Sequence, residues 1–126
     1  MANPNIISLT TLKGKSVGSI PAVTSESDFI INASNSGKVL KINQIVAANI
    51  DGTNAIGATV SLCTNAAAPS ASNTYAIVPN VSVPAKASLI CIDKSSTIYL
   101  EENMSIRITT GVASKISFTA SYEEIS

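Results

Sequence analysis

The sequence predicts an all-β protein, an antiparallel β-sandwich of the jelly-roll kind with about eight strands. Three observations lead to this prediction. Apolar and polar residues alternate over many short stretches, which is the period of a strand with one buried face. Clusters of Gly, Pro, Asn, Asp and Ser separate these stretches at regular intervals. A helical period of useful length appears nowhere in the sequence.

The composition agrees with this class. The chain has 126 residues, which is long enough for one domain with its own core. Only 13% of the residues are charged, and eight basic residues balance eight acidic ones. We therefore expect a single β-sandwich domain over residues 1–126, in which residues 1–14 form an extended N-terminal arm and hydroxyl side chains cover much of the surface.

The stretch from Lys38 to Cys63 contains the longest alternation. Two alternating segments flank the turn-rich residues Asp51–Asn54, so we predict two antiparallel strands that pair as a ribbon. The residues of one parity in the first segment are predicted to face the core: Leu40, Ile42, Val46, Ala48 and Ile50. A two-stranded ribbon is not stable alone, so the other strands must cover this face.

Shorter alternations predict strands at 6–12, 28–32, 75–78, 88–92 and 97–100, and a weak edge strand or loop at 15–20. Residues 104–109 and 116–122 alternate on either side of a turn and predict a C-terminal hairpin.

Two further segments have an irregular character. Pro79 and Pro84 bracket a segment that fits an edge strand or a kink, because proline cannot donate to an inner ladder. Residues Asn65–Thr74 are small and polar and predict an exposed loop.

The charge pattern argues against nucleic acid as a partner, and the hydropathy pattern argues against a membrane. Seven lysines are scattered along the chain and Arg107 is the single arginine, whereas binding a duplex needs clustered cations. No stretch is long and apolar enough to span a membrane, and the start lacks the features of a signal peptide. A weakly charged surface also tolerates close packing against other protein.

The sequence offers no enzymatic chemistry, and we predict no catalytic, cofactor-binding or metal-binding residues. Histidine is absent, which excludes Ser-His-Asp and Cys-His arrangements. Two cysteines cannot assemble a zinc site, and no glycine-rich phosphate loop is present. Cofactors are not expected.

Several residues are of types that can act in catalysis or metal binding, and we interpret each of them as structural. Glu101–Glu102 and Glu123–Glu124 are interpreted as solvated turn and terminal charges rather than a glycosidase pair. Asp51–Asn54 lacks the acidic ligand that ends a calcium loop and is interpreted as a turn. Cys63 and Cys91 are interpreted as small buried hydrophobic residues, with a disulfide between them left open.

Stretches at both ends and in the middle of the chain carry a family resemblance: Asn3–Ile6, Lys41–Asn43, Asn49–Thr53, Val83–Ala85, Leu89–Lys94, Ile98–Glu102 and Ser121–Ser126. Together they resemble small structural proteins of tailed phages, particularly those of cyanobacterial and other marine hosts. The loop Asn65–Thr74 has no counterpart. The resemblance implies a β-sandwich virion component, made in the host cytoplasm, with no enzymatic role.

Two functions follow from this resemblance. The first is a capsid decoration or cement protein, a trimer or dimer that binds the major capsid protein on the outer head lattice and stabilises it. Its expected contacts are the N-terminal dozen residues and the Asn65–Thr74 loop. The alternative is a neck-, tail- or fibre-associated module that recognises a host glycan or another virion protein. An exposed Tyr75 or Tyr99 would be the structural sign of the alternative.

Overall fold

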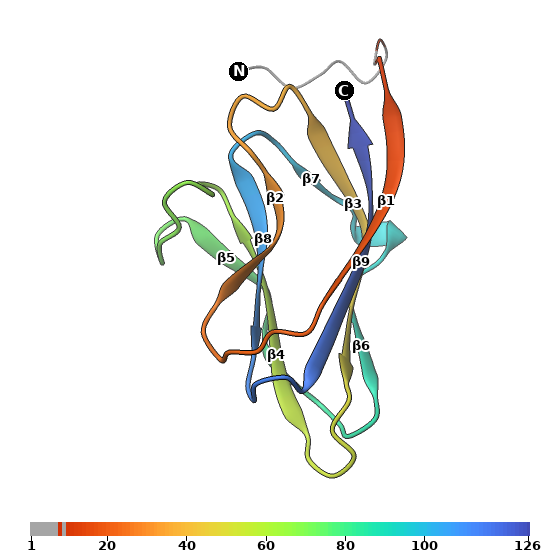
Figure 1. Ribbon diagram of the computed structural model, residues 1–126, viewed down its shortest axis with the longest axis vertical. Helices are drawn as coiled ribbons and strands as arrows, with labels where there is room; N and C mark the ends of the chain where they lie inside the picture. The colour runs from red at the N-terminus through yellow and green to blue at the C-terminus, as the bar shows by residue number, and fades with distance from the viewer. Residues whose placement is uncertain (1–7, 9) are drawn as a thin grey trace.

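The computed structural model describes residues 8 and 10–126, and these form nine strands, one short helix and their connections (Figure 1). The strands make two antiparallel sheets packed face to face. The elements are β1 (Leu12–Ser19), β2 (Ser27–Asn32), β3 (Val39–Asn49), β4 (Ile56–Cys63), β5 (Thr74–Val83), β6 (Ser88–Ile92), the 3-10 helix η2 (Lys94–Ser96), β7 (Ile98–Leu100), β8 (Met104–Thr110) and β9 (Ile116–Ile125).

The strands pair in a nested order that defines a jelly roll. β1 pairs with β9, β2 with β8, β3 with β6 and β7, and β4 with β5. One sheet has the order β1-β9-β3-β6, with β7 also on β3, and the other has the order β2-β8-β4-β5. Since β6 and β7 line the same side of β3, they act as one strand interrupted by η2. The predicted all-β, jelly-roll-like sandwich is therefore confirmed.

The local pairings predicted from the sequence are wrong. β3 and β4 do not form a ribbon, because β3 lies in the first sheet and β4 in the second. The C-terminal hairpin is wrong for the same reason, since β8 pairs with β2 and β4 whereas β9 pairs with β1 and β3. In both places the connecting loop crosses from one sheet to the other. Alternation of apolar and polar residues predicts a strand with one buried face, but it does not predict which strand pairs with it.

The predicted buried face of β3 is right only for its first half. A β-bulge between Ile42 and Gln44 shifts the register against β9. Beyond it, Ile45 and Ala47 face the core with no exposed surface, while Ile50, predicted to be buried, is 44% exposed. Val46 and Ala48 are half-buried on the outer face. The bulge inserts one residue, and because the period of a strand is two, one residue exchanges the faces.

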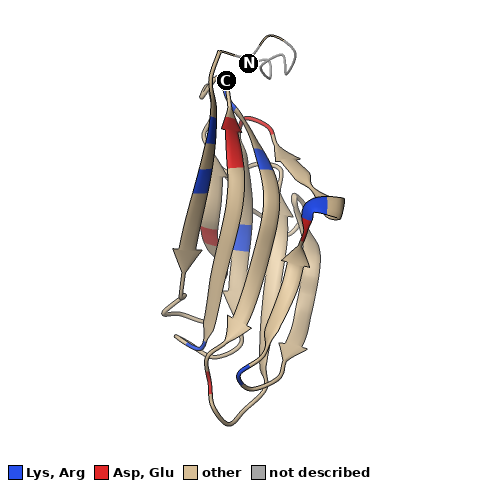
Figure 2. Ribbon diagram, turned by 90° about the vertical axis from the view of Figure 1, so that its right-hand side faces the viewer, with Lys and Arg blue, Asp and Glu red and all other residues tan. Residues whose placement is uncertain are grey.

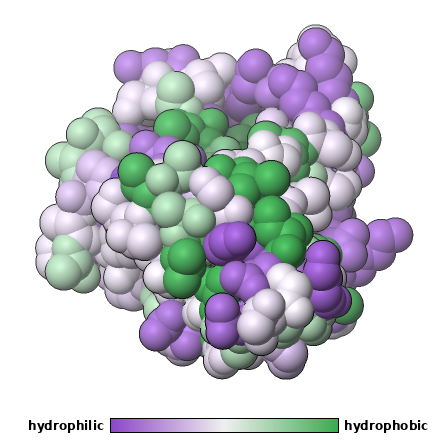
Figure 3. Space-filling model, turned by 60° about the horizontal axis from the view of Figure 1, so that its bottom comes forward, coloured by the Kyte–Doolittle hydropathy of each residue, from purple (hydrophilic) through white to green (hydrophobic). Residues whose placement is uncertain are grey.

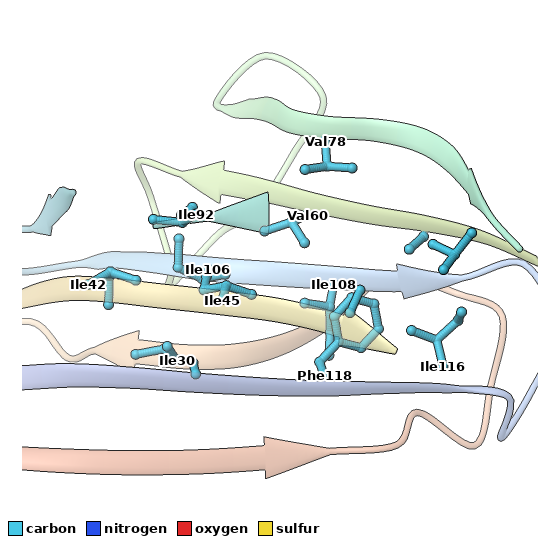
Figure 4. Close-up of a cluster of buried hydrophobic side chains, with 14 of the residues drawn as sticks. Ile30, Ile42, Ile45, Val60, Val78, Ile92, Ile106, Ile108, Ile116 and Phe118 are labelled. Carbon is cyan, nitrogen blue, oxygen red and sulfur yellow. The ribbon is translucent and has the colours of Figure 1, made fainter. Parts of the chain in front are cut away.

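The core lies between the two sheets and is made mainly of isoleucine and valine (Figure 4). Phe118 of β9 is its largest fully buried side chain, and its ring lies 6.2 Å from that of Phe29 of β2. β-branched side chains fit the pleated faces of strands and have few rotamers to lose on burial. The core therefore stabilises the sandwich without a metal or disulfide among the described residues.

Other sequence predictions concern the edges and loops. β5 is an edge strand that contains Pro79 and ends just before Pro84. Of the two interpretations of this segment, an edge strand or a kink, the edge strand is confirmed. Residues 65–73 form an exposed loop with two turns, as predicted. Residues 12–19 form the edge strand β1, so 12–14 belong to the sheet and not to an arm. The strand predicted at 6–12 is wrong where the structure describes it, because residues 8, 10 and 11 lie outside any strand and β1 begins at Leu12. Residues 1–7 and 9 of the predicted arm lie outside the described residues.

Both cysteines are free thiols. Cys63 is fully buried in β4, which confirms its interpretation as a small hydrophobic residue. Cys91 is half-buried in β6, in the opposite sheet, and burial raises the pKa of its thiol to about 11. The Cys91 thiol is therefore protonated at neutral pH.

We predict that Phe118→Ala lowers the free energy of unfolding by about 3–5 kcal/mol, because it opens a cavity at the centre of the sandwich. Urea denaturation followed by circular dichroism measures the loss. The matched control is Thr119→Ala, on the exposed side of the same strand, which should change stability by no more than about 0.5 kcal/mol. Equal losses in the two variants would contradict this placement of the core.

Candidate interaction surfaces

The described residues hold no group of three or more His, Cys, Asp or Glu side chains that could bind a metal ion. Glu123 and Glu124 are neighbours in β9 and contact lysines, while Glu102 lies in the β7–β8 turn and accepts a hydrogen bond from the Gly37 amide. The Asp51 carboxylate accepts hydrogen bonds from the amides of Thr53 (2.7 Å) and Asn54 (3.1 Å), which lower its pKa. Asp51 thus closes the bend between β3 and β4, which joins the two sheets and is not the predicted hairpin turn.

Charged side chains are spread thinly over the surface (Figure 2). Arg107 in β8 contacts Glu26 at 2.9 Å and Asp28 at 2.8 Å, so the single arginine is committed to joining the edge strand β2 to the sheet. Among the described residues, no helix is long and apolar enough to cross a membrane.

Four loops meet at the end of the sandwich that lies opposite the C-terminus, and we call this the loop end (Figure 1). They join β1 to β2, β3 to β4, β5 to β6, and β8 to β9. Backbone hydrogen bonds tie them together: Ser114 donates to Pro21 (2.8 Å), Ile50 to Lys115 (2.9 Å) and Lys86 to Asp51 (3.2 Å). Because each loop is bonded to another, the loop end is held as one frame.

Large apolar side chains are exposed on this frame, and Figure 3 shows hydrophobic residues gathered across it. We call Ile20, Val23, Ile50 and Val112 the apolar patch; their exposed fractions lie between 44% and 52%. Lys86, Lys115 and Asp51 lie in the same loops and supply charge beside the patch. An apolar centre with a polar rim is the usual anatomy of a protein–protein interface.

Of the two contacts predicted from the sequence, the loop lies at the opposite end of the sandwich. The loop at 65–73 is held there by Asn103, whose side chain donates to Asn65 (3.0 Å) and accepts from the Ala67 amide (3.0 Å). The loop is exposed but small and polar. The N-terminal dozen lie mostly outside the described residues. Sequence reasoning missed the apolar patch, since its four members come from three loops and none stands out alone.

The outer face of the β1-β9-β3 sheet carries a second surface, which we call the sheet-face groove. A hollow of about 720 Å³ lies between this face and η2, lined by Gly14, Asn43, Gln44, Asp93, Lys94, Ser95, Ser121, Tyr122 and Glu123. Two smaller hollows share lining residues with it, Gln44 and Ser121 on one side and Asn43, Lys94 and Glu123 on the other. The three hollows therefore adjoin and form one elongated depression.

The two tyrosines considered for sugar binding lie in different sheets. Tyr75 is the second residue of β5, just after the long loop, and is 57% exposed. Tyr99 in β7 is 45% exposed and pairs with Lys41, which also pairs with Glu123. Directly paired residues project to the same face of a sheet. Tyr99 therefore stands beside the sheet-face groove, and Tyr75 does not.

At the end of the molecule that carries the C-terminus, Glu124 joins three segments. Its carboxylate lies 3.1 Å from Lys15 of β1 and 3.1 Å from Lys38, just before β3. The hydrogen bond from Lys38 is the largest of the effects that lower the pKa of Glu124, and Glu124 in turn raises the pKa of Lys15. This carboxylate thus stabilises the order β1-β9-β3 where the strands end.

The comparisons with known proteins find distant likenesses only. No family model and no curated protein matches the chain. A subunit of the disulfide-linked pili that form Bacillus endospore appendages is 16% identical, with a TM-score of 0.47 over 99% of this chain and 92% of that one. A protein of the T13 particle of infectious bursal disease virus (IBDV) is 8% identical, with a TM-score of 0.45 over 94% of this chain and 32% of that one. These likenesses transfer no property to this chain.

We predict that Glu124→Gln destabilises the protein at neutral pH and loses this effect in acid. The lowered pKa means that the ion pairs of Glu124 stabilise the fold fully above its ordinary pKa near 4.5 and are lost as the pH falls through the lowered value. Urea denaturation of both proteins between about pH 7 and about pH 3 measures the difference. A cost that stays constant with pH would contradict it. Glu123→Gln, which loses a longer and more exposed pair with Lys41 (3.8 Å), is the control and should cost less at neutral pH.

Proposed function

We propose that this chain is a virion structural protein of the decoration or cement type, which binds the outer head lattice through its loop end and stabilises it. The observation that carries the proposal is the apolar patch: Ile20, Val23, Ile50 and Val112, exposed on loops that hydrogen bonds hold together. In this orientation the C-terminus and the loop at 65–73 point away from the lattice (Figure 1).

The energetics of such a contact suit a repeated lattice. Each side chain of the patch is about half exposed, so burying the rest of it contributes about 1 kcal/mol. A preformed frame loses little entropy when it binds. A contact of modest strength is sufficient, because many copies on a fixed lattice act together and each raises the effective concentration of the next. The balanced charge of the chain lets neighbouring copies pack closely.

The proposed partners are the major capsid protein and further copies of this chain, as a trimer or dimer that bridges neighbouring capsomers. The sequence resemblance to virion proteins of tailed phages supports this assignment, and no enzymatic step is part of it. The alternative, a neck-, tail- or fibre-associated module that recognises a host glycan or another virion protein, is favoured by one observation: Tyr99 is exposed beside the sheet-face groove.

The apolar patch is tested with two residues that match in type and exposure. Ile20 and Ile31 are each 51% exposed, but Ile20 belongs to the patch and Ile31 lies on the edge strand β2. We predict that Ile20→Asp weakens binding to capsids that lack this protein by at least about tenfold, because docking would bury the new charge. Ile31→Asp should bind as the unchanged protein does.

Co-sedimentation with such capsids measures the affinity, and the heat resistance of the decorated capsids measures the stabilisation. Thermal unfolding of each variant shows that the fold is retained. Val112→Asp, in a different loop, should reproduce the effect of Ile20→Asp. Loss of binding in Ile31→Asp with full binding by Ile20→Asp would overturn the docking surface.

A further inference from the structure

We propose that the sheet-face groove is a binding site for a linear oligosaccharide. The inference goes beyond the proposed function, because it assigns a ligand to a surface that docking through the loop end leaves free. It rests on three features of the described residues: the shape of the groove, the polar side chains that line it, and an exposed tyrosine beside it.

The shape follows from the sequence of β1. Its outward positions that line the groove are Gly14, Ser16 and Gly18, so no large side chain rises from this strand, while η2 forms a wall on the other side. A Cβ atom added at Gly14 would meet no atom within 4 Å. Gly14 therefore leaves open space, whereas a Cβ atom at Gly18 would be in ordinary contact with Phe118 (3.7 Å) and Thr119 (3.9 Å). The main hollow, about 720 Å³, is within the usual range of ligand sites, and the adjoining hollows extend it lengthwise.

The lining offers the groups that recognise sugar hydroxyls. The side-chain amides of Asn43 and Gln44 make no hydrogen bond within the described part of the chain, so their donors and acceptors are available. The Ser121 hydroxyl lies opposite Gln44 in the β3–β9 pairing. The Glu123 carboxylate, in a loose 3.8 Å pair with Lys41, adds an acceptor. Paired donors and acceptors on neighbouring strands match the neighbouring hydroxyls of a pyranose ring.

Tyr99 supplies the apolar half of the site. It ends the cross-strand row Gly14–Glu123–Lys41–Tyr99 on the outer face of the sheet. A tyrosine that is 45% exposed offers a flat ring with a polar tip, which suits the C–H face of a sugar as well as its hydroxyls. The distance along this row, across four strands, is about 14 Å, which accommodates several sugar units.

The charges of the groove select against other ligands. Asp93 and Glu123 stand with Lys41 and Lys94, so neither sign dominates. The pKa of Asp93 is lowered by hydrogen bonds from Ser95, so this carboxylate is ionised at neutral pH and repels phosphates. A neutral or weakly charged oligosaccharide fits this balance, whereas a polyanion does not.

The test uses the full chain, with soluble cellohexaose, maltohexaose and chitohexaose and a printed array of bacterial surface polysaccharides as probes. NMR titration should show shifts at Gln44 and Ser121 for at least one probe. Gln44→Ala and Tyr99→Ala should each weaken that binding by about tenfold. Gly14→Leu, whose Cβ atom would meet no atom within 4 Å, adds a large side chain to the groove and should abolish binding. Tyr75→Ala, which changes an exposed tyrosine of the other sheet, is the matched control and should bind normally.

The site would be overturned by no binding of any probe at millimolar concentration, or by binding that survives Gly14→Leu and Tyr99→Ala. Shifts in the groove that depend on protein concentration without sugar would also overturn it, because they would assign the face to a second copy of the chain. Capsid docking by the same variants is measured separately, so failure here leaves the proposed function standing.

Discussion

The pairing of the last strand with both the first and the third is the constraint on which the rest of the structure depends. β9 lies between β1 and β3, so that Leu12 stands opposite Ile125 at the far end of the chain. Such distant pairings carry a high cost in chain entropy before any contact forms. Burial of the isoleucine-rich core offsets that cost, and Phe118 of β9 lies at its centre.

The nested pairing also decides where the surfaces lie. Each loop that crosses between the sheets falls at one of two ends, which brings Ile20, Ile50 and Val112 together although they are far apart in the sequence. The same pairing leaves β1 as an edge with small outward residues, and so opens the groove beside η2. The sandwich therefore offers two separate surfaces: the apolar patch at the loop end and the polar sheet-face groove on the outer face of one sheet.

Alternation and turn residues were sufficient to predict the fold class, because both signals are local. Strand order was not predictable, since β3–β4 and β8–β9 read as hairpins although their loops cross between sheets. A single bulge, between Ile42 and Gln44, reversed the faces of β3. The polar Gln44 interrupts the apolar series at that point, but one polar residue does not distinguish a bulge from an exception within a regular strand. The exposure of Tyr99 was anticipated as a sign of sugar binding, but the groove beside it depends on the packing of η2 against the sheet.

The measurement that tests the central claim most directly is the number of copies of this chain per virion, by quantitative mass spectrometry of purified particles against the major capsid protein. If the protein decorates the whole lattice, we expect about one copy per copy of the major capsid protein, or one copy per three-fold position. About a dozen copies would contradict the lattice role and place the protein at the portal, neck or tail. Absence from the particle would contradict both structural functions.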